Sequence, residues 1–136
     1  MLLNINPLLT GELLKRLDEM GHSDYVLIAD ANFPAHRLDP HTVEYPGTTV
    51  PQVAAAICEV LPLDPDLPPA LMDSQQTPAP AVQDEIRAAI GHASPPRMVE
   101  RWAYYDLAAG ASVVVSSGEL RLWANVILYK GLIGRG

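Results

Sequence analysis

Residues 20–36 read MGHSDYVLIADANFPAH, and this stretch is the most informative part of the sequence. The run 25–29 is continuously apolar, which predicts a β-strand that is buried on both faces. Gly21 and His22 precede the strand in a turn, and Asp30 follows it directly. Open α/β sheets bind their ligands beyond the carboxyl ends of their strands. The stretch therefore predicts a buried strand with a candidate ligand-binding carboxylate at its carboxyl end.

Helical and strand patterns alternate along the remaining chain. Apolar residues at helical spacing predict helices at residues 8–20, 50–61, 81–93 and 104–109. Thr10 is the expected N-cap of the first helix, and Gly21 is expected to end it in a left-handed conformation. Short apolar runs predict further strands at residues 42–45, 70–72, 98–102, 112–116 and 123–129. This alternation predicts a three-layer α/β/α fold around a central sheet.

We expect a single domain that spans residues 1–136. Residues 62–80 hold six prolines, which predict a rigid surface excursion. They do not indicate a linker between domains, because the flanking segments are each too small to fold alone.

Composition excludes several classes of function. The net charge is −7 and the nine basic residues do not cluster, which argues against binding to nucleic acid or to anionic membranes. No apolar run is long enough for a membrane span, and the first residues lack the pattern of a signal peptide. The single cysteine, Cys58, lies in an apolar helical context and is expected to be a core residue. A cytoplasmic protein is expected, and a charged content of only 18% favours an oligomer.

His22 and Asp30 are the leading candidates for acid/base chemistry. An imidazole titrates near neutral pH, and a carboxylate beside it is a suitable partner for moving protons on a small substrate. Each residue also has a structural explanation, because His22 could bind backbone carbonyls and Asp30 could cap the next turn. The strand between them spans roughly 17 Å, so the two side chains cannot meet while it is extended. Either His22 folds back, or it meets Asp30 of another subunit, or the two act at different points of one site.

A metal or nucleotide cofactor is not expected. His36 and His41 do not form a compact ligand motif with His22, and His92 is expected to be a favourable charge at a helix end. The motifs of phosphate-binding loops, dinucleotide-binding folds and hydrolase nucleophile elbows do not occur.

A second informative patch covers residues 116–128. Asn125 enters an apolar strand, so its amide requires hydrogen-bonding partners, either in a neighbouring loop or on a sugar. Trp123 offers a flat apolar face that can stack on the C–H groups of a pyranose, together with one N–H donor.

At these patches the sequence resembles the D-ribose pyranase / L-fucose mutarotase family. The resemblance runs through nearly the whole length and is carried by Gly21-His22-x-Asp24, by Asp30-Ala31 and by the Ala-Asn-Val-Ile-Leu run at 124–128. Two segments are similar to the fucose branch in particular: Phe33-Pro34-Ala35-His36 and Arg101-Trp102-Ala103-Tyr104-Tyr105-Asp106.

The resemblance implies an isomerase that interconverts the α and β anomers of a free monosaccharide, L-fucose or a related sugar, without metal or cofactor. It implies that His22 transfers protons, that Asp30 holds the sugar or orients an imidazole, and that Arg101, Trp123 and Asn125 bind substrate. It also implies a ring-shaped homo-oligomer, commonly a decamer, with sites completed by a neighbouring subunit.

One departure from the family pattern bears on activity. The family usually has tyrosine at the position of Trp123, and an indole N–H donates but cannot accept or relay a proton. Tyr104, Tyr105 or water would then replace the phenol, or the protein would bind sugar with diminished catalysis. A ribose pyranase and a non-catalytic sugar-binding or transport-accessory protein are therefore the alternative functions.

Overall fold

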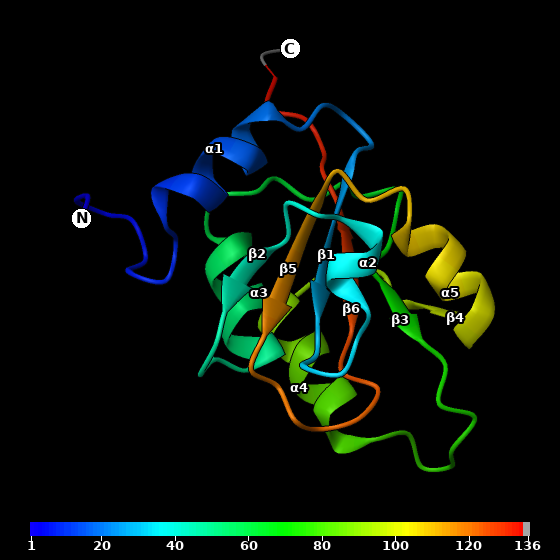
Figure 1. The fold of residues 1–136 in the computed structure, drawn as a ribbon. Helices are drawn as coiled ribbons and strands as arrows, with labels where there is room; N and C mark the ends of the chain where they lie inside the picture. Colours follow the sequence, from blue (N-terminus) through cyan, green and yellow to red (C-terminus); the bar gives the residue numbers. More distant parts are fainter. Residues whose placement is uncertain (135–136) are drawn as a thin grey trace.

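A six-stranded sheet forms the centre of the molecule, in a computed structural model that describes residues 1–134 (Figure 1). The strands are β1 (Tyr25–Ala29), β2 (Val43–Tyr45), β3 (Ala70–Met72), β4 (Arg97–Val99), β5 (Val113–Ser117) and β6 (Val126–Tyr129). Their order across the sheet is β2-β5-β1-β6-β3-β4. Strand β1 is central, as its apolar run predicts: Val26, Leu27 and Ile28 are fully buried.

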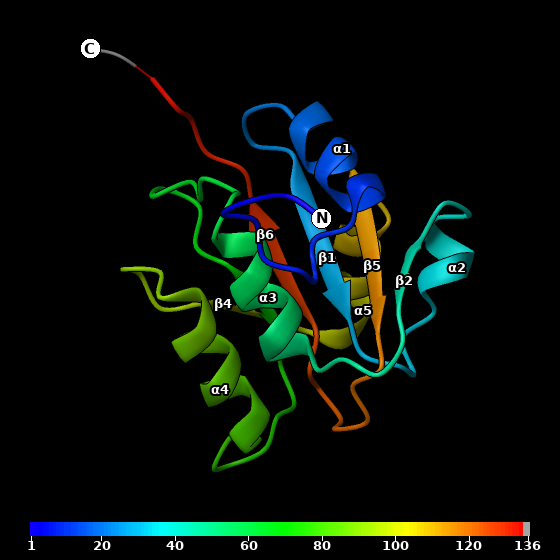
Figure 2. The same ribbon diagram turned by 90° about the vertical axis from the view of Figure 1, so that its left-hand side faces the viewer.

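Helices cover both faces of this sheet (Figure 2). The helices are α1 (Gly11–Glu19), α2 (Ala35–Leu38), α3 (Val50–Cys58), α4 (Ala81–Ile90) and α5 (Arg101–Ala108). One apolar cluster joins α1, α3 and α4 to residues such as Val26 and Ile28 of β1. The other joins α2 and α5 to Leu27 and Ala29. Alternate residues of one strand thus face opposite cores, and the expected three-layer α/β/α fold is confirmed.

The helix starts follow from capping side chains. The Thr10 hydroxyl accepts a hydrogen bond from the Leu13 N–H, so α1 begins at Gly11 and not at residue 8. The Glu100 carboxylate accepts from the N–H groups of Trp102 and Ala103, and α5 therefore begins three residues before the expected residue 104. The same cap shortens the expected strand 98–102 to β4.

Helix α3 ends at Cys58 and not at residue 61, and the ends of α1 and α4 also differ from the sequence prediction. Gly21 does not adopt the left-handed conformation, because α1 ends with an extended Met20 cap and the positive φ lies at Ser23 (71°). Helix α4 ends at Ile90 and not at residue 93, because Gly91 has a φ of 66° and caps it.

Strand β6 runs antiparallel to β1, whereas β5 runs parallel to it. Tyr25 pairs with Tyr129, and Ile28 pairs with Val126. The start of β6 therefore lies beside the end of β1, and its end lies beside the turn that precedes β1. The expected strand 123–129 begins only at Val126 because Trp123 has a φ of 66°, which no regular strand accommodates.

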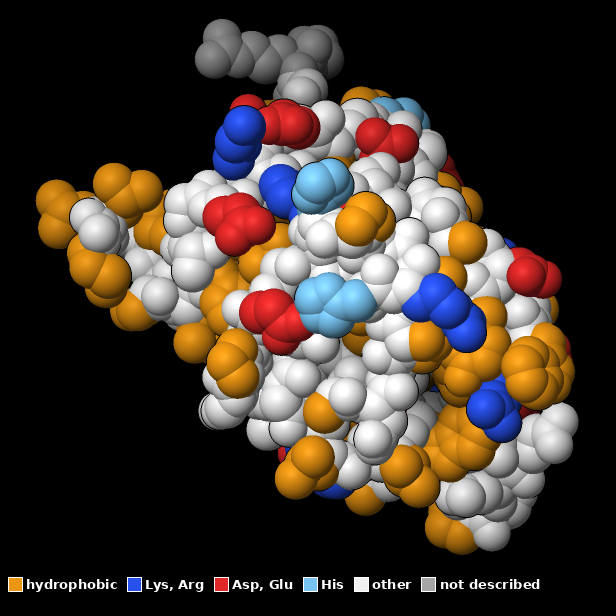
Figure 3. All heavy atoms as spheres, viewed as in Figure 1, with side chains coloured by type: hydrophobic (Ala, Val, Ile, Leu, Met, Phe, Trp, Pro, Cys, Tyr) orange, Lys and Arg blue, Asp and Glu red, His pale blue; other side chains and the backbone are white. Residues whose placement is uncertain are grey.

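Hydrophobic side chains are also exposed at several places on the surface. Figure 3 shows them on the projecting N-terminal segment and over α5. Met1 and Leu3 are more than nine-tenths exposed, and Trp102 of α5 is 63% exposed. Within residues 1–134, no helix is long and apolar enough to cross a membrane.

Candidate functional site

A pocket of about 230 Å³ opens beyond the carboxyl end of β1, where the sequence predicts a ligand site. Its walls are formed by the β1–α2 connection, β3, α5 and the segment before β6. Its lining residues are Asp30, Asn32, Phe33, Met72, Arg101, Tyr105, Leu122, Trp123 and Asn125. Four of the five site residues predicted from the sequence therefore line one cavity.

Asp30 and Asn125 form the polar floor of this pocket. The Asn125 Oδ1 accepts a hydrogen bond from the Asp30 backbone N–H at 2.8 Å, and its Nδ2 donates to the Asp30 Oδ2 at 3.2 Å. The other carboxylate oxygen, Oδ1, accepts from the Asn32 N–H at 2.9 Å. The two bonds between Asp30 and Asn125 join residues 95 positions apart, and they supply the partners that the Asn125 amide requires.

Burial changes the acidity of Asp30. The residue is only 5% exposed, and loss of hydration raises the pKa of its carboxyl group. The hydrogen bonds from the Asn32 and Phe33 backbone and from the Asn125 amide oppose this effect and lower the pKa, but burial is the larger cause. The pocket therefore contains an acid that holds its proton to higher pH than an ordinary aspartate.

Aromatic rings and a guanidinium form the opposite wall. The Arg101 guanidinium lies 4.8 Å from the centroid of the Trp102 ring, and its Nε donates to the Tyr105 hydroxyl at 3.3 Å. Phe33 packs against Tyr105 with ring centroids 5.4 Å apart. Arg101 is exposed, so it brings a positive charge to the mouth of the pocket. An apolar wall with a few fixed polar groups is a usual design for binding small polar ligands.

The two tyrosines considered as substitutes for a phenol at position 123 have different environments. Tyr104 is fully buried and donates from its hydroxyl to the Ala70 carbonyl, and burial raises its pKa well above 10.0. Tyr105 lines the pocket and is half-buried. Tyr105 is therefore the phenol that a ligand in this cavity can reach.

His22 does not line this pocket. It lies in the turn before β1, at the end of the strand remote from Asp30, and its Nε2 is 3.1 Å from the Asp64 Oδ2. This arrangement agrees with the expectation that the His22 and Asp30 side chains of one chain cannot meet while the strand between them is extended. The alternative in which His22 folds back onto Asp30 of its own chain is not what the structure adopts.

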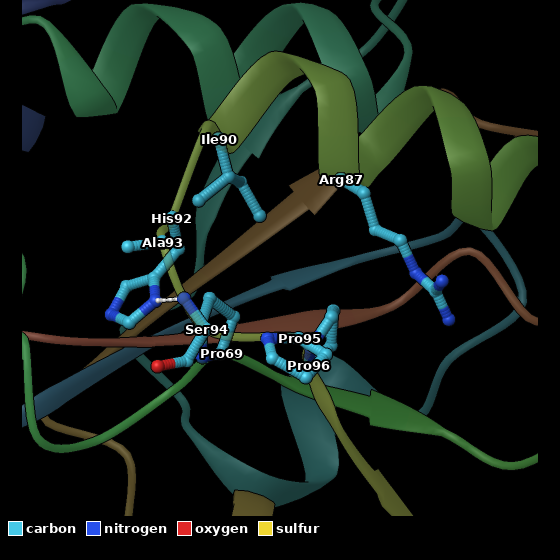
Figure 4. A pocket seen from close by; sticks show the side chains of 8 residues that line it. All are labelled: Pro69, Arg87, Ile90, His92, Ala93, Ser94, Pro95 and Pro96. Carbon is cyan, nitrogen blue, oxygen red and sulfur yellow. Dashed lines mark hydrogen bonds between the residues drawn. The ribbon is translucent and has the colours of Figure 1, made fainter.

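The rings of His36 and His92 have local partners. His36 contacts Glu44, and His92 donates from Nε2 to the Asp64 carbonyl at 2.9 Å. Among residues 1–134, no group of three or more metal-ligating side chains gathers. His92 also borders a separate cavity of about 310 Å³, which lies between the end of α4 and the loop before β4 (Figure 4).

Sequence reasoning missed several walls of the pocket. Asn32 and Phe33 follow Asp30 directly, so their proximity follows from chain continuity alone. Met72 and Leu122 reach the pocket through strand order and a loop, and nothing in their local sequence indicates this.

Comparison with known proteins agrees with this fold. The model of the RbsD / FucU transport protein family matches residues 3–133. The chain is similar to the fucose mutarotase of Streptococcus pneumoniae, solved in complex with L-fucose, with 30% identity and a TM-score of 0.89 over 98% of this chain and 100% of that one. It is similar to FucU from Bifidobacterium longum, with 35% identity and a TM-score of 0.86 over 96% and 99% of the two chains.

The RbsD of Bacillus subtilis, solved with D-ribose, has the same fold at lower identity. The identity is 18% and the TM-score 0.77, over 95% of this chain and 98% of that one. The chain belongs to the RbsD/FucU family and lies closer to FucU than to RbsD.

Proposed function

We propose that this protein is a monosaccharide mutarotase that interconverts the α and β anomers of L-fucose or a closely related free sugar. The observation that carries the proposal is the buried Asp30, whose pKa is raised inside a cavity with polar and aromatic walls. Family membership supports it, since one relative of 30% identity is a fucose mutarotase bound to L-fucose. In this proposal the described chain acts as one sugar-handling domain.

Anomer exchange requires two proton transfers on the sugar. One group removes the proton of the anomeric hydroxyl while another protonates the ring oxygen. The bond between the anomeric carbon and the ring oxygen then breaks, which leaves an open-chain aldehyde and a free hydroxyl. Rotation of the aldehyde and reversal of both transfers close the ring on the other face. A well-placed acid or base contributes about 10²- to 10⁴-fold to such a step.

Asp30 is suited to one of these transfers. Its raised pKa brings the protonated and ionised forms closer in free energy near neutral pH, which favours exchange in both directions. Its Oδ2 bond to the Asn125 amide keeps the carboxyl group oriented toward the ligand. Asn125 and Arg101 then bind sugar hydroxyls, and the Trp123 face stacks on the apolar side of the ring.

His22 of a neighbouring copy is the second proton-transfer group in this proposal. Within one chain His22 lies at the far end of β1 from Asp30, so a site that uses both requires two copies. Exposed apolar side chains at Leu3, Trp102 and Leu122 provide surface that such contacts would cover. We propose a ring-shaped homo-oligomer, a decamer, with sites at its subunit interfaces.

The pocket favours a fucose-type sugar over ribose. Phe33 of the Phe-Pro-Ala-His segment forms part of the wall and packs against Tyr105. A bulky apolar ring suits the methyl group of a 6-deoxy sugar, which ribose lacks.

The test is NMR exchange between the α and β signals of L-fucose, D-ribose and D-galactose, with and without protein. We expect acceleration above the spontaneous rate, greatest for L-fucose, and its loss in Asp30→Asn and in His22→Asn. A greater acceleration of D-ribose would identify a ribose pyranase instead. Absence of acceleration for all three sugars would overturn the proposal.

Trp123 favours a second function, a non-catalytic sugar-binding protein. An indole in the pocket wall supplies stacking and one donor but relays no proton. Saturation-transfer NMR with L-fucose distinguishes the two functions, because a binding protein would show contact with the sugar and no faster anomer exchange.

A further inference from the structure

We propose that Gln83 is a positioning residue for the Asp30 pocket: its side-chain amide holds the backbone of Met72 and Trp123, and so keeps the Trp123 ring in the pocket wall. The inference rests on the proposed function for the identity of the ligand. Gln83 belongs to the first turn of α4 and does not itself line the pocket. Met72 and Trp123 both line it, although they lie on different segments of the chain.

The Gln83 side chain occupies a position where a helix usually places an apolar residue. It lies three residues before Ile86 and seven before Ile90, on the apolar face of α4, and it is fully buried. Among residues 1–134, its Oε1 is the only buried side-chain oxygen or nitrogen without a hydrogen-bond partner. Burial of an unpaired acceptor lowers stability, so Oε1 disfavours a glutamine here. The advantage of the amide therefore lies in its Nε2 group.

The Nε2 group of Gln83 joins two walls of the pocket. It donates to the Met72 carbonyl at 2.9 Å and to the Trp123 carbonyl at 3.1 Å. These bonds use both hydrogens of the amide nitrogen. They also fix the direction of the amide, because the reversed group would place its oxygen against two carbonyl oxygens. One side chain thus ties the end of β3 to the segment before β6.

Trp123 has a backbone conformation that needs such an anchor. Its φ of 66° lies in the left-handed region, which costs a bulky residue free energy unless the surrounding structure enforces it. Packing does not enforce it on every side, because Trp123 borders a second cavity of about 420 Å³, toward the start of α4, as well as the Asp30 pocket. The hydrogen bond from Gln83 to the Trp123 carbonyl supplies a constraint that packing lacks.

The peptide group between Trp123 and Ala124 connects Gln83 to the polar floor of the pocket. Its carbonyl accepts from Gln83, and its N–H points the opposite way because the peptide is trans. That N–H donates to the Asp30 carboxylate and opposes the rise in the pKa of this group. Asn125 follows directly and donates to Asp30 from its own amide. Gln83 therefore acts on one short segment, residues 123–125, that carries both a ring for the sugar and two donors for Asp30.

Gln83→Met tests this role, because methionine keeps the approximate size of the side chain and removes both donors. The chain has two tryptophans, so labelling with 5-fluorotryptophan gives one ¹⁹F NMR signal for each, and the Trp123 signal is assigned by its loss in Trp123→Phe. We expect the Trp123 signal of Gln83→Met to move even without sugar, while the Trp102 signal stays in place. Titration of the Trp123 signal with L-fucose should give a Kd raised about tenfold, because the ring is no longer held in its binding position.

L-Fucose anomer exchange separates positioning from proton transfer. Gln83 has no direct contact with Asp30, so KM should rise about as much as Kd, whereas kcat should fall by about threefold or less. The matched control is Ile86→Val, which shortens a fully buried side chain on the same face of α4 by one carbon. It lowers stability, but it should keep the parental Trp123 signal and the parental KM.

The proposal fails if Gln83→Met keeps either the parental Trp123 signal or the parental Kd. It also fails if Ile86→Val changes both as much, because the effect would then come from lost stability. Should Gln83→Met fail to fold, Gln83→Leu replaces it, and a parental signal or Kd in that variant would equally overturn the proposal. Failure of the proposed function is distinguishable, because then the parent accelerates no sugar while the ¹⁹F signals without sugar still report whether Gln83 holds Trp123.

Discussion

Burial raises the pKa of Asp30 above its ordinary value of 3.8, which gives the pH dependence of stability a definite sign. The folded chain holds this proton to higher pH than the unfolded chain does. The contribution of Asp30 to stability is therefore fully present below the unfolded pKa and is lost as the pH rises through the folded pKa.

We predict that Asp30→Asn gains stability relative to the parent as the pH rises from about 4 to 8, because the amide carries no charge to bury. Thermal melts of the two proteins across this range measure the gap between their Tm values. A gap that moves in the parent's favour with rising pH would contradict the raised pKa.

The adjacent Tyr104 and Tyr105 offer a matched pair of single-residue variants. Tyr105→Phe removes the pocket hydroxyl that accepts from the Arg101 Nε, so it releases a proposed sugar-binding side chain. We predict that anomer exchange falls about tenfold with little change in stability. Tyr104→Phe removes the buried bond to the Ala70 carbonyl, and it should cost about 1–3 kcal/mol in free energy of unfolding while exchange persists. NMR exchange and denaturant unfolding measure both. If Tyr104→Phe were the variant that loses exchange, the assignment of the pocket phenol would be wrong.

At the scale of elements, Glu119 joins the β5–β6 connection to helix α3. It is 3% exposed, and its Oε2 accepts from the Val50 N–H at the first turn of the helix at 3.3 Å. Hydrogen bonds from the Arg121 side chain lower its pKa below 4.5, and those from the Arg121 and Val50 backbone act in the same direction. A carboxyl group whose pKa is lowered by folding stabilises the folded protein at pH values above its unfolded-state pKa. This stabilisation is lost as the pH falls through its folded-state pKa.

We predict that Glu119→Gln lowers the free energy of unfolding by about 1–2 kcal/mol at neutral pH, and that the loss shrinks as the pH falls below 4.5. Urea unfolding at several pH values measures it. Glu85→Gln is the control, because Glu85 is an exposed partner of the same arginine and such ion pairs contribute little. An equal loss in the control would mean that the Arg121 contacts, and not the α3 cap, determine the effect.

Element types were more predictable from the sequence than their ends. Periodicity located four of the five helices within residues 1–134 but missed the short α2, which is only four residues long. Capping fixed the limits of the others: Glu100 starts α5 early and Gly91 ends α4 early. The contact between Asp30 and Asn125 can be predicted only if β6 is known to be antiparallel to β1, and no local sequence pattern indicates this pairing. Asp64 gave no signal at all, because it stands among prolines whose local sequence indicates only a rigid loop.

For the whole assembly, a site shared between subunits predicts the activity of particles that contain two different variants. His22→Asn and Asp30→Asn should each lose anomer exchange as pure proteins. Co-expressed in one assembly, they should recover part of it, because some interfaces then pair an intact His22 with an intact Asp30. Light scattering should also give a mass several times the 14.7 kDa of one chain.

The two pure variants, mixed after folding without exchange of subunits, are the control and should stay inactive. A monomeric parent that accelerates exchange, or co-expressed variants that recover none, would contradict the shared site.

Strand β6 lies between the two proposed proton-transfer groups. Asn125, just before the strand, is hydrogen-bonded to Asp30, and Lys130, just after it, is hydrogen-bonded to the turn that carries His22. In an assembly that shares sites, each copy would give its two groups to two different sites. The β1–β6 pair would then act as a spacer that fixes the repeat distance between neighbouring sites, about 17 Å along the strand. Lengthening both strands by two residues would alter the closure of the ring, and with it every site at once.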